Sequence, residues 1–357
     1  MVASHGLVLE NSADLTVRGN DFNAAGQGGA IELETRGAGG KGLDLKAGAT
    51  LDLGVASQTL QSASLGQFTG VLRLRALQTA TNDHLLLNDL SSTVKNASHV
   101  AIEGYRIYDR SVDNGVLNAA LLTSIATDAS AFVANSDSIK SSVLASNSSL
   151  SSIATVRPGV EIVNASGNLT LGSETTSSTS DWNLSSMRYG GLKVPGVLTL
   201  RAAGDILLYN SISDGFESAS YNSALSQRNG LLPENVQSWN YCFVAGADFG
   251  SIDRKTVKAI ESLSGDLGSI KLGKNAYTAS ISGGNSAKLS TAVMAQRFQT
   301  IRTGGGSISL HAGRDVQLLN QFATIYTAGV QVADATMGGV FAVPTPRIAS
   351  DTESGAA

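Results

Sequence analysis

The chain has one cysteine, Cys242, among 357 residues, and it has no block of basic residues. A single thiol excludes both an internal disulfide and a cysteine-based zinc cluster. The formal net charge of −4 does not favour a surface that follows phosphates, so we expect no nucleic-acid binding. No apolar run reaches the 18 residues of a membrane span, and residues 1–20 lack the pattern of a secretory signal peptide. The sequence therefore predicts a protein that does not span a membrane.

Aromatic residues and proline are also scarce. Aromatics make up 5% of the chain against 42% for all hydrophobic residues, and 39 glycines stand against five prolines. Few aromatics favour a narrow core filled by Leu, Val, Ile and Ala. Many glycines with few prolines favour tight corners with positive φ over a disordered linker.

One sequence pattern occurs twice, as GVLTLRAAGDILL at 196–208 and as GSISLHAGRDVQLL at 306–319. The corresponding apolar positions are Leu198 with Ile308, Leu200 with Leu310, and Ile206 with Val316. Apolar residues that alternate with polar ones predict short strands with one buried face. The glycines and small residues between them predict corners.

Weaker copies of this pattern begin at Gly39, Gly70 and Gly159. A unit this short cannot bury its apolar face alone, so neighbouring units must stack on it. We therefore predict an all-β fold, a right-handed parallel β-helix (solenoid) with a helical excursion and a loop insertion. The strings RPGV at 157–160 and VPGV at 194–197 lie 37 residues apart, which we interpret as about two coils of roughly 20 residues each.

The helical excursion is predicted where the spacing of apolar residues changes to three and four. Apolar residues follow this spacing from Leu117 to Val133, and Asp113, Asn114 or Asn118 could cap the helix. Nine serines in residues 136–152 predict a mobile stretch that is too polar to pack. The predicted organisation is β-helix coils at 1–111, a helical and Ser-rich excursion at 112–155, coils at 156–213, a loop insertion at 214–240, coils at 241–345 and a disordered tail at 346–357.

Four segments together resemble one known family. They are DWNLSSMRYGG at 181–191, VPGVLTLRAAGDILLYNSISDGF at 194–216, SWNYCFVAGAD at 238–248 and GSISLHAGRDVQLLNQFATIYTAG at 306–329. In content and order they resemble the filamentous haemagglutinin family exoproteins of Gram-negative bacteria, which two-partner secretion exports as β-helical surface fibres. The resemblance covers residues from about 156 to 329. Residues 1–110 match the family only in their general pattern of short strands and polar or glycine corners.

The resemblance implies a non-catalytic shaft segment of a secreted or cell-surface adhesin. It implies an outer-membrane two-partner secretion transporter as a partner, acting on other parts of the protein, and a host-cell or bacterial surface ligand. The implied location is extracellular or on the surface of a Gram-negative bacterium. The Asn-Pro-Asn signals of the family's secretion domain and the Val-Glu-Asn-Asn element before toxin modules are absent. Both ends of the chain lack capping patterns, so we expect an internal piece of a longer protein.

The alternative is a β-helix enzyme that binds or cleaves polysaccharides. Its nearest available chemistry is Asp44 and Asp52, which point outward between buried leucines, together with the outward Arg73 and Arg75. Paired carboxylates can act as general acid and base on a glycosidic bond. The short strings typical of pectinases do not occur, so solvated acids on a strand face are the favoured interpretation. We assign no catalytic residue.

No metal or cofactor site is predicted either. The string GGKGLD at 39–44 fits part of a calcium-binding repeat, but Lys46 stands where that repeat needs a large apolar residue. The histidines, His5, His84, His99 and His311, are scattered.

Two other sets of residues have structural interpretations. Asp205 and Asp315 recur at one corner and are expected to accept backbone N–H groups of the next strand. Trp182, Trp239 and Tyr241 are expected to be buried anchors beside the loop insertion.

Overall fold

The computed structural model describes residues 1–17, 29–54, 70–174, 181–215, 232, 236–274, 299–320 and 322–330. The chain forms two compact units, one of Met1–Arg106 with Thr127–Gly159 and one of Ile107–Ala126 with Val160–Ala357. The loop insertion expected at 214–240 falls mostly outside the described residues, and the tail expected at 346–357 falls wholly outside them. No helix among the described residues is long and apolar enough to cross a membrane.

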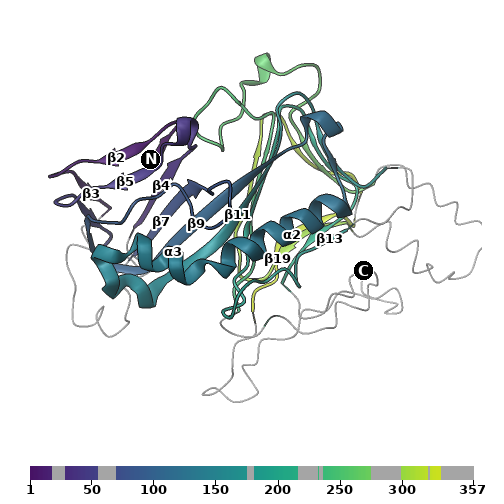
Figure 1. Cartoon of the computed structure of the whole chain (residues 1–357). Coiled ribbons are helices and arrows are strands. Elements are labelled where there is room, and N and C mark those ends of the chain that lie inside the picture. The colour runs from purple at the N-terminus through teal and green to yellow at the C-terminus, as the bar shows by residue number, and fades with distance from the viewer. Residues whose placement is uncertain are drawn as a thin grey trace, which may run out of the picture. The chain divides into compact units, whose positions relative to one another are not determined.

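The first unit consists mainly of parallel strands (Figure 1). Its largest sheet contains β1 (Val2–Ala3), β4 (Ala30–Thr35), β7 (Gly70–Leu77), β9 (Ala97–Asp109) and the beginning of β11 (Ala154–Asn164). A second sheet pairs β2 (Leu7–Leu9) with β5 (Leu43–Leu45), and a third contains β3 (Asp14–Thr16), β6 (Thr50–Asp52) and β8 (Thr93–Lys95). A 3₁₀ turn, η1 (Ala38–Gly40), precedes β5.

The core of the first unit follows from the alternation of residues along its strands. Leu72, Leu74 and Ala76 of β7 are fully buried, whereas Arg73 between them is exposed. Leu33 of β4 and Ile102 of β9 are fully buried as well. Because alternate residues of a strand share one face, these apolar residues form one continuous layer.

Helices cover part of this layer. The chain leaves β9 through η2 (Ser111–Asp113) and β10 (Val116–Leu117), and then forms α2 (Ala119–Ala134), α3 (Ser136–Val143) and the 3₁₀ segment η3 (Ala145–Ile153). Asn118 caps α2, because its Oδ1 accepts the N–H of Leu121 at 2.9 Å. The predicted helix and one of its three candidate caps are thus confirmed.

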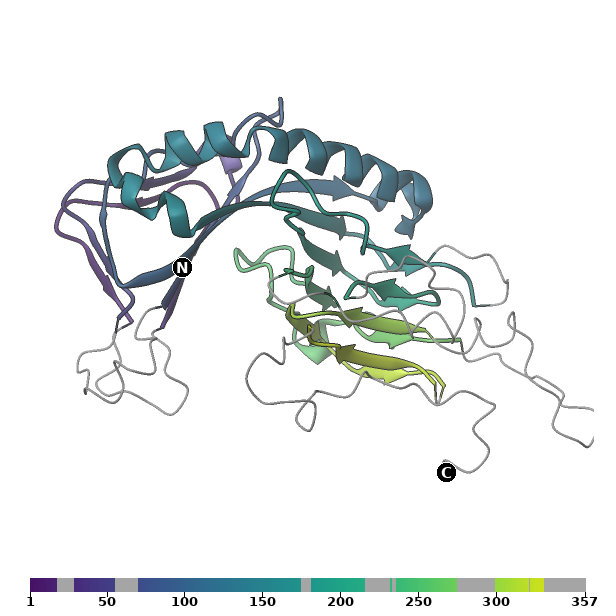
Figure 2. The same ribbon diagram turned by 90° about the horizontal axis from the view of Figure 1, so that it is seen from below.

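Phe132 of α2 is fully buried against Gly104 of β9. A Cβ at position 104 would lie 2.2 Å from the Phe132 ring, so glycine is required for this close contact. Figures 1 and 2 both show α3 lying along the strands of this unit.

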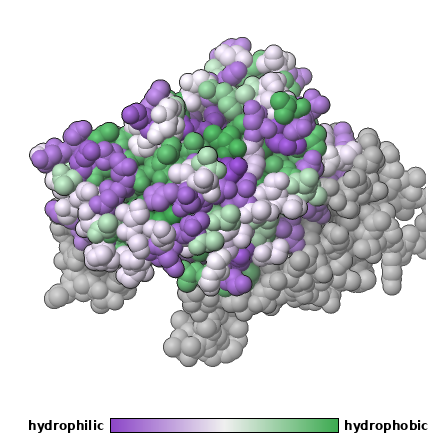
Figure 3. Space-filling view, viewed as in Figure 1, coloured by the Kyte–Doolittle hydropathy of each residue, from purple (hydrophilic) through white to green (hydrophobic). Residues whose placement is uncertain are grey.

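The prediction that residues 136–152 are too polar to pack is wrong. Ile139 and Val143, one helical turn apart, are fully buried, and the carbonyl of Val143 accepts the N–H of Leu90 at 2.7 Å. Ser146 and Asn147 donate hydrogen bonds to Asp89 and to the carbonyls of residues 90 and 92. The serines lie mostly on the exposed side. Figure 3 shows hydrophilic and hydrophobic residues mixed over the face that is seen in Figure 1.

The second unit repeats one circuit of three strands. Each circuit gives one strand to each of three parallel sheets, and Figure 2 shows these strands stacked in chain order from teal to yellow. One sheet of this unit contains the end of β11 with β14 (Val197–Ala202), β17 (Asn240–Ala245) and β20 (Ile308–Ala312). The next contains β10, β12 (Leu169–Leu171), β15 (Ile206–Leu208), β18 (Ile270–Leu272) and β21 (Val316–Leu318). The third contains β13 (Trp182–Asn183), β16 (Ile212–Ser213), β19 (Thr300–Thr303) and β22 (Thr324–Thr327).

The register confirms the repeat found in the sequence. Leu198 lies opposite Tyr241, which lies opposite Ile308, and Ile206 is aligned in the same way with Ile270 and Val316. Every strand pair with a defined register is parallel, so the prediction of a mainly parallel β structure is confirmed.

The predicted coil length is wrong. The strings at 157–160 and 194–197 lie on or just before β11 and β14, which are neighbours in one sheet. Thirty-seven residues therefore correspond to one circuit and not two. Four residues separate β11 from β12, but ten separate β12 from β13 and thirteen separate β13 from β14, and these longer connections lengthen the circuit.

Candidate functional site

The two candidate acids of the enzyme alternative do not share a site. Asp44 lies on β5 and forms an ion pair with Lys46, whereas Asp52 lies on β6 in a different sheet. Oδ1 of Asp52 accepts the backbone N–H of Gly54 and the side-chain amide of Asn96, each at 3.1 Å. Both carboxylates therefore have local partners on separate sheets.

The two arginines named with these acids differ sharply. Arg73 is exposed, but Arg75 has a side chain that is only 2% exposed. Arg75 was expected to be outward like Arg73 and lies on the same face of β7, but it is buried there, because glutamates on both neighbouring strands enclose its guanidinium.

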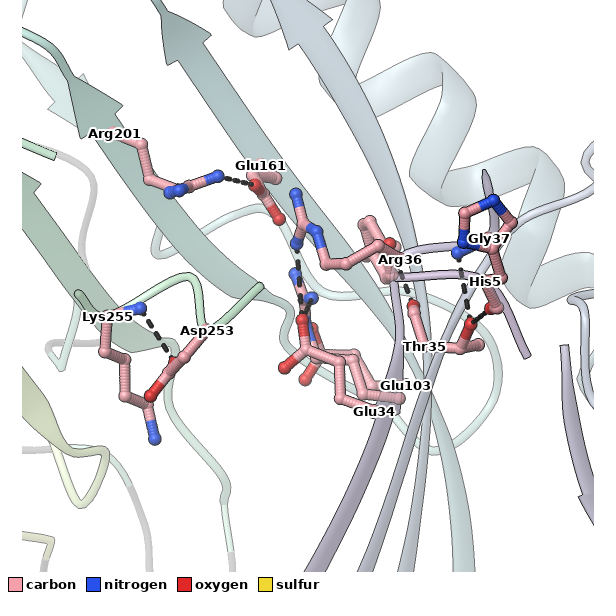
Figure 4. A network of polar contacts seen from close by, with 12 residues as sticks. His5, Glu34, Thr35, Arg36, Gly37, Glu103, Glu161, Arg201, Asp253 and Lys255 are labelled. Atoms are coloured by element: carbon pink, nitrogen blue, oxygen red, sulfur yellow. Dashed lines mark hydrogen bonds and ion pairs between the residues drawn. The ribbon is translucent and has the colours of Figure 1, made fainter. Parts of the chain in front are cut away.

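Glu34, Arg75 and Glu103 form a charged ladder on β4, β7 and β9. Figure 4 labels its two acids, Glu34 and Glu103. The register places Arg75 opposite Glu34 on one side and opposite Glu103 on the other. Arg75 donates from Nη1 to Glu34 Oε1 at 2.5 Å and from Nε to Glu103 Oε1 at 2.8 Å. One guanidinium thus connects three successive strands through side chains, in addition to the backbone hydrogen bonds.

Tyr105 completes the surroundings of the charged ladder. Its ring is fully buried and lies 3.8 Å from the Arg75 guanidinium carbon, and its hydroxyl donates to the carbonyl of Thr35 at 3.0 Å. A cation over an aromatic face is favourable when both are shielded from water. Arg36 adds a second cation, 3.2 Å from Glu34 and 5.3 Å from the ring centre. The carboxylate of Glu34 therefore faces two arginines.

The second unit has a pair of the same kind. Arg201 of β14 donates to Glu161 of β11 at 3.2 Å, and both side chains are at most 5% exposed (Figure 4). The guanidinium lies 4.6 Å from the Phe249 ring and donates to the carbonyl of Asp248 at 3.3 Å. A buried ion pair is stable only when further hydrogen bonds compensate for lost hydration, and both pairs have such contacts.

Phe249 belongs to an insertion between β17 and β18, at 246–269, that the sequence analysis missed. The insertion contains a bridge from Ala247 to Val257 and the 3₁₀ turn η5 (Ile260–Ser262). Phe249 and Val257 pack on Cys242 and Val244 of β17. The signal available in the sequence was the length of chain between the two aligned strands, because the matching stretch in the circuits on either side is only three residues long.

The corner at Asp214 is the third site with buried charge. Asp214 is fully buried and accepts two hydrogen bonds from Arg188, at 2.8 and 3.1 Å, and one from the backbone of Trp239 at 2.8 Å. The Trp239 ring meets Tyr189 edge to face, and its Nε1 donates to Met187 at 3.0 Å. Trp182, Trp239 and Tyr241 are each 1% exposed, so the prediction of buried anchors is confirmed.

The Asp214 corner gives a testable prediction. Asp214→Asn should lower the free energy of unfolding by about 1.5–3 kcal/mol, because the charge opposite Arg188 is lost in a buried place. Asp113→Asn is the matched control, since Asp113 is half exposed in its pair with Arg110. Tryptophan fluorescence during urea unfolding would measure both. Equal effects of the two substitutions would contradict the structural role of Asp214.

Asp205 has the corner role expected from the sequence. Its Oδ1 accepts the N–H of Ser269, just before β18, at 2.8 Å, and its Oδ2 lies 2.7 Å from Lys271. Asp315 accepts instead from the side chain of Gln317. Cys242 is a free, buried thiol, and the described part of the chain contains no group of three metal-ligating side chains.

Comparison with protein-family models, curated proteins and solved structures gives no match to this chain. The function is therefore argued from its own geometry. The buried charged side chains pair with one another across strands of successive circuits. This arrangement is suited to fixing the register in which those strands pair.

Proposed function

We propose that the chain is a non-catalytic shaft segment of a secreted or cell-surface exoprotein similar to filamentous haemagglutinin, folded as a right-handed parallel β-helix. The observation that carries this proposal is the circuit of three strands, repeated in register. Stacking is the only way such short strands bury their apolar faces. The sequence resemblance over residues from about 156 to 329 supports the same proposal independently.

The mechanical role follows from the contacts between circuits. Stacked strands share a ladder of backbone hydrogen bonds with a rise of about 4.8 Å per circuit. Arg75, Arg201 and Asp205 add ion pairs between neighbouring circuits. Because each side chain has its partners only in one register, sliding of one circuit over the next would leave buried charges unpaired. These contacts favour a stiff shaft.

Surface loops are the proposed contact points for a host-cell or bacterial surface ligand. The turn at η2 carries Val112, which is 86% exposed, and Leu192 in another loop is 77% exposed. Loops on a rigid scaffold vary without loss of the fold and therefore often carry recognition. The outer-membrane transporter is the proposed partner for export.

The proposal predicts that this segment reaches the cell surface. An epitope tag inserted beside Val112 in the full-length protein should bind antibody on intact cells of the source bacterium. It should not bind when the gene for the outer-membrane transporter is deleted. A periplasmic protein with the same tag is the control for cell integrity. Detection of the tag only after cell lysis, with the transporter present, would contradict the proposed location.

The polysaccharide-cleaving alternative has no specific observation in its favour. Asp44 and Asp52 belong to different sheets, and Arg75 is already held by two glutamates.

A further inference from the structure

Three strands of the first unit bring basic side chains to one face around a small residue. Val71 of β7 lies opposite His99 of β9, and Arg73 lies opposite Ala101. Alternate residues of a strand point to the same side, so Arg73, His99 and Ala101 share a face. Ala101 has no side chain beyond Cβ, and it lies between the two basic residues in this arrangement.

Arg157 of β11 joins the same face. A Cβ at Gly159 would lie 2.5 Å from Glu103 Oε1 and 2.6 Å from the Tyr105 Cβ, so position 159 faces the side of Glu103. Arg157 stands two residues earlier on the strand and therefore points the same way. Burial lowers the pKa of Arg157, Glu103 raises it, and Arg73 lowers it. Burial also lowers the pKa of His99, and Arg157 and Arg73 lower it further, whereas a hydrogen bond to the backbone of Ile153 raises it.

The Arg157 guanidinium is not fully used by the protein. Its Nε is buried and has no hydrogen-bond partner. The nearby Glu103 also accepts the Nε of Arg75 at 2.8 Å, so two arginines share one carboxylate. Two further acids lie on this face, Glu32 opposite Arg73 and Glu34 opposite Arg75, and Glu34 is already paired with Arg75. A buried donor without a partner is costly, and a bound anion is one way to satisfy it.

We propose that Arg73, His99 and Arg157 form a binding site for a phosphate group, with Ala101 beneath it. Guanidinium groups suit tetrahedral oxyanions, because they present several donors in a fixed plane. The two arginines supply the charge and the donors, and His99 lies at the edge of the site. This site is independent of the proposed shaft function.

Isothermal titration calorimetry at low ionic strength tests the site, with inorganic phosphate and glucose 6-phosphate as separate probes. Saturable binding of both supports a site for a phosphate carried on a larger ligand, and binding of inorganic phosphate alone supports a site for the free ion. Arg157→Gln and Arg73→Gln should each weaken binding roughly tenfold to a hundredfold, through loss of a charged hydrogen bond. Arg106→Gln is the control, because Arg106 pairs with Asp128 instead.

Two results would overturn the site. One is that neither probe binds to the wild-type chain. The other is that both glutamine variants, folded by circular dichroism, bind as tightly as the wild type does. If Arg157→Gln does not fold, Arg73→Gln decides the outcome, because Arg73 is exposed and its replacement leaves the buried layer unchanged.

Discussion

Replacing Arg75 with alanine should destabilise the first unit by about 3–5 kcal/mol, because it leaves buried carboxylates without their partner. Glu34 is fully buried and Glu103 is 13% exposed, and both accept hydrogen bonds from Arg75. The ring of Tyr105 also loses the cation 3.8 Å away. Urea unfolding followed by far-ultraviolet circular dichroism would measure the change in unfolding free energy.

Arg73→Ala is a matched control for this experiment. Arg73 lies on the same strand two residues earlier and has the same side chain, but it is exposed. Its removal should change the unfolding free energy by no more than about 0.5 kcal/mol. Because both variants lose one positive charge, a change in net charge alone cannot separate them. Similar small effects of both substitutions would contradict the charged ladder.

Replacing Phe132 with alanine should cost about 3–5 kcal/mol, since a fully buried ring is lost from the contact between α2 and β9. Ser130→Ala, at an exposed position of the same helix, should cost no more than about 0.5 kcal/mol. Thermal and urea unfolding would measure both variants. An equal, small effect would mean that α2 does not pack on the strands.

A double-mutant cycle tests the contact between Phe132 and Gly104 more specifically. Gly104→Ala alone should destabilise by about 1–3 kcal/mol, because its Cβ would meet the Phe132 ring at 2.2 Å. In the Phe132→Ala background the ring is absent, and Gly104→Ala should then cost much less. Additive effects of the two substitutions would show that Gly104 and Phe132 do not meet.

The strand register could be predicted from sequence because it depends on local alternation. Leu198 and Ile308 were aligned through their shared spacing to the next glycine and aspartate, and the structure places both opposite Tyr241. The N-cap at Asn118 and the corner role of Asp205 are equally local. Such features depend on a few neighbouring residues, which is why a single sequence reveals them.

The prediction that the Ser-rich segment does not pack is wrong because it rests on the serine content and not on the spacing of the apolar residues. Ile139 and Val143 are four residues apart and form a buried stripe on α3, and the serines around them cover the exposed side. These two apolar residues are enough for α3 to pack, since the underlying strands supply the rest of the apolar surface.

The charged ladder could not be predicted from the sequence. Arg75 is separated from Glu34 by 41 residues and from Glu103 by 28. The circuits differ in length because their corner loops differ, so no fixed period connects the three positions. Only the pairing of β4, β7 and β9 brings them together. The contact of Arg201 with the insertion at 246–269 could not be predicted for the same reason, because only the pairing of strands brings these distant residues together.

The most direct test of the proposed shaft is the sequence of the whole gene around this chain. The account predicts further circuits of three short strands on both sides, an amino-terminal secretion domain and a neighbouring gene for an outer-membrane transporter. A reading frame that encodes only these residues, with no transporter gene nearby, would contradict the shaft function.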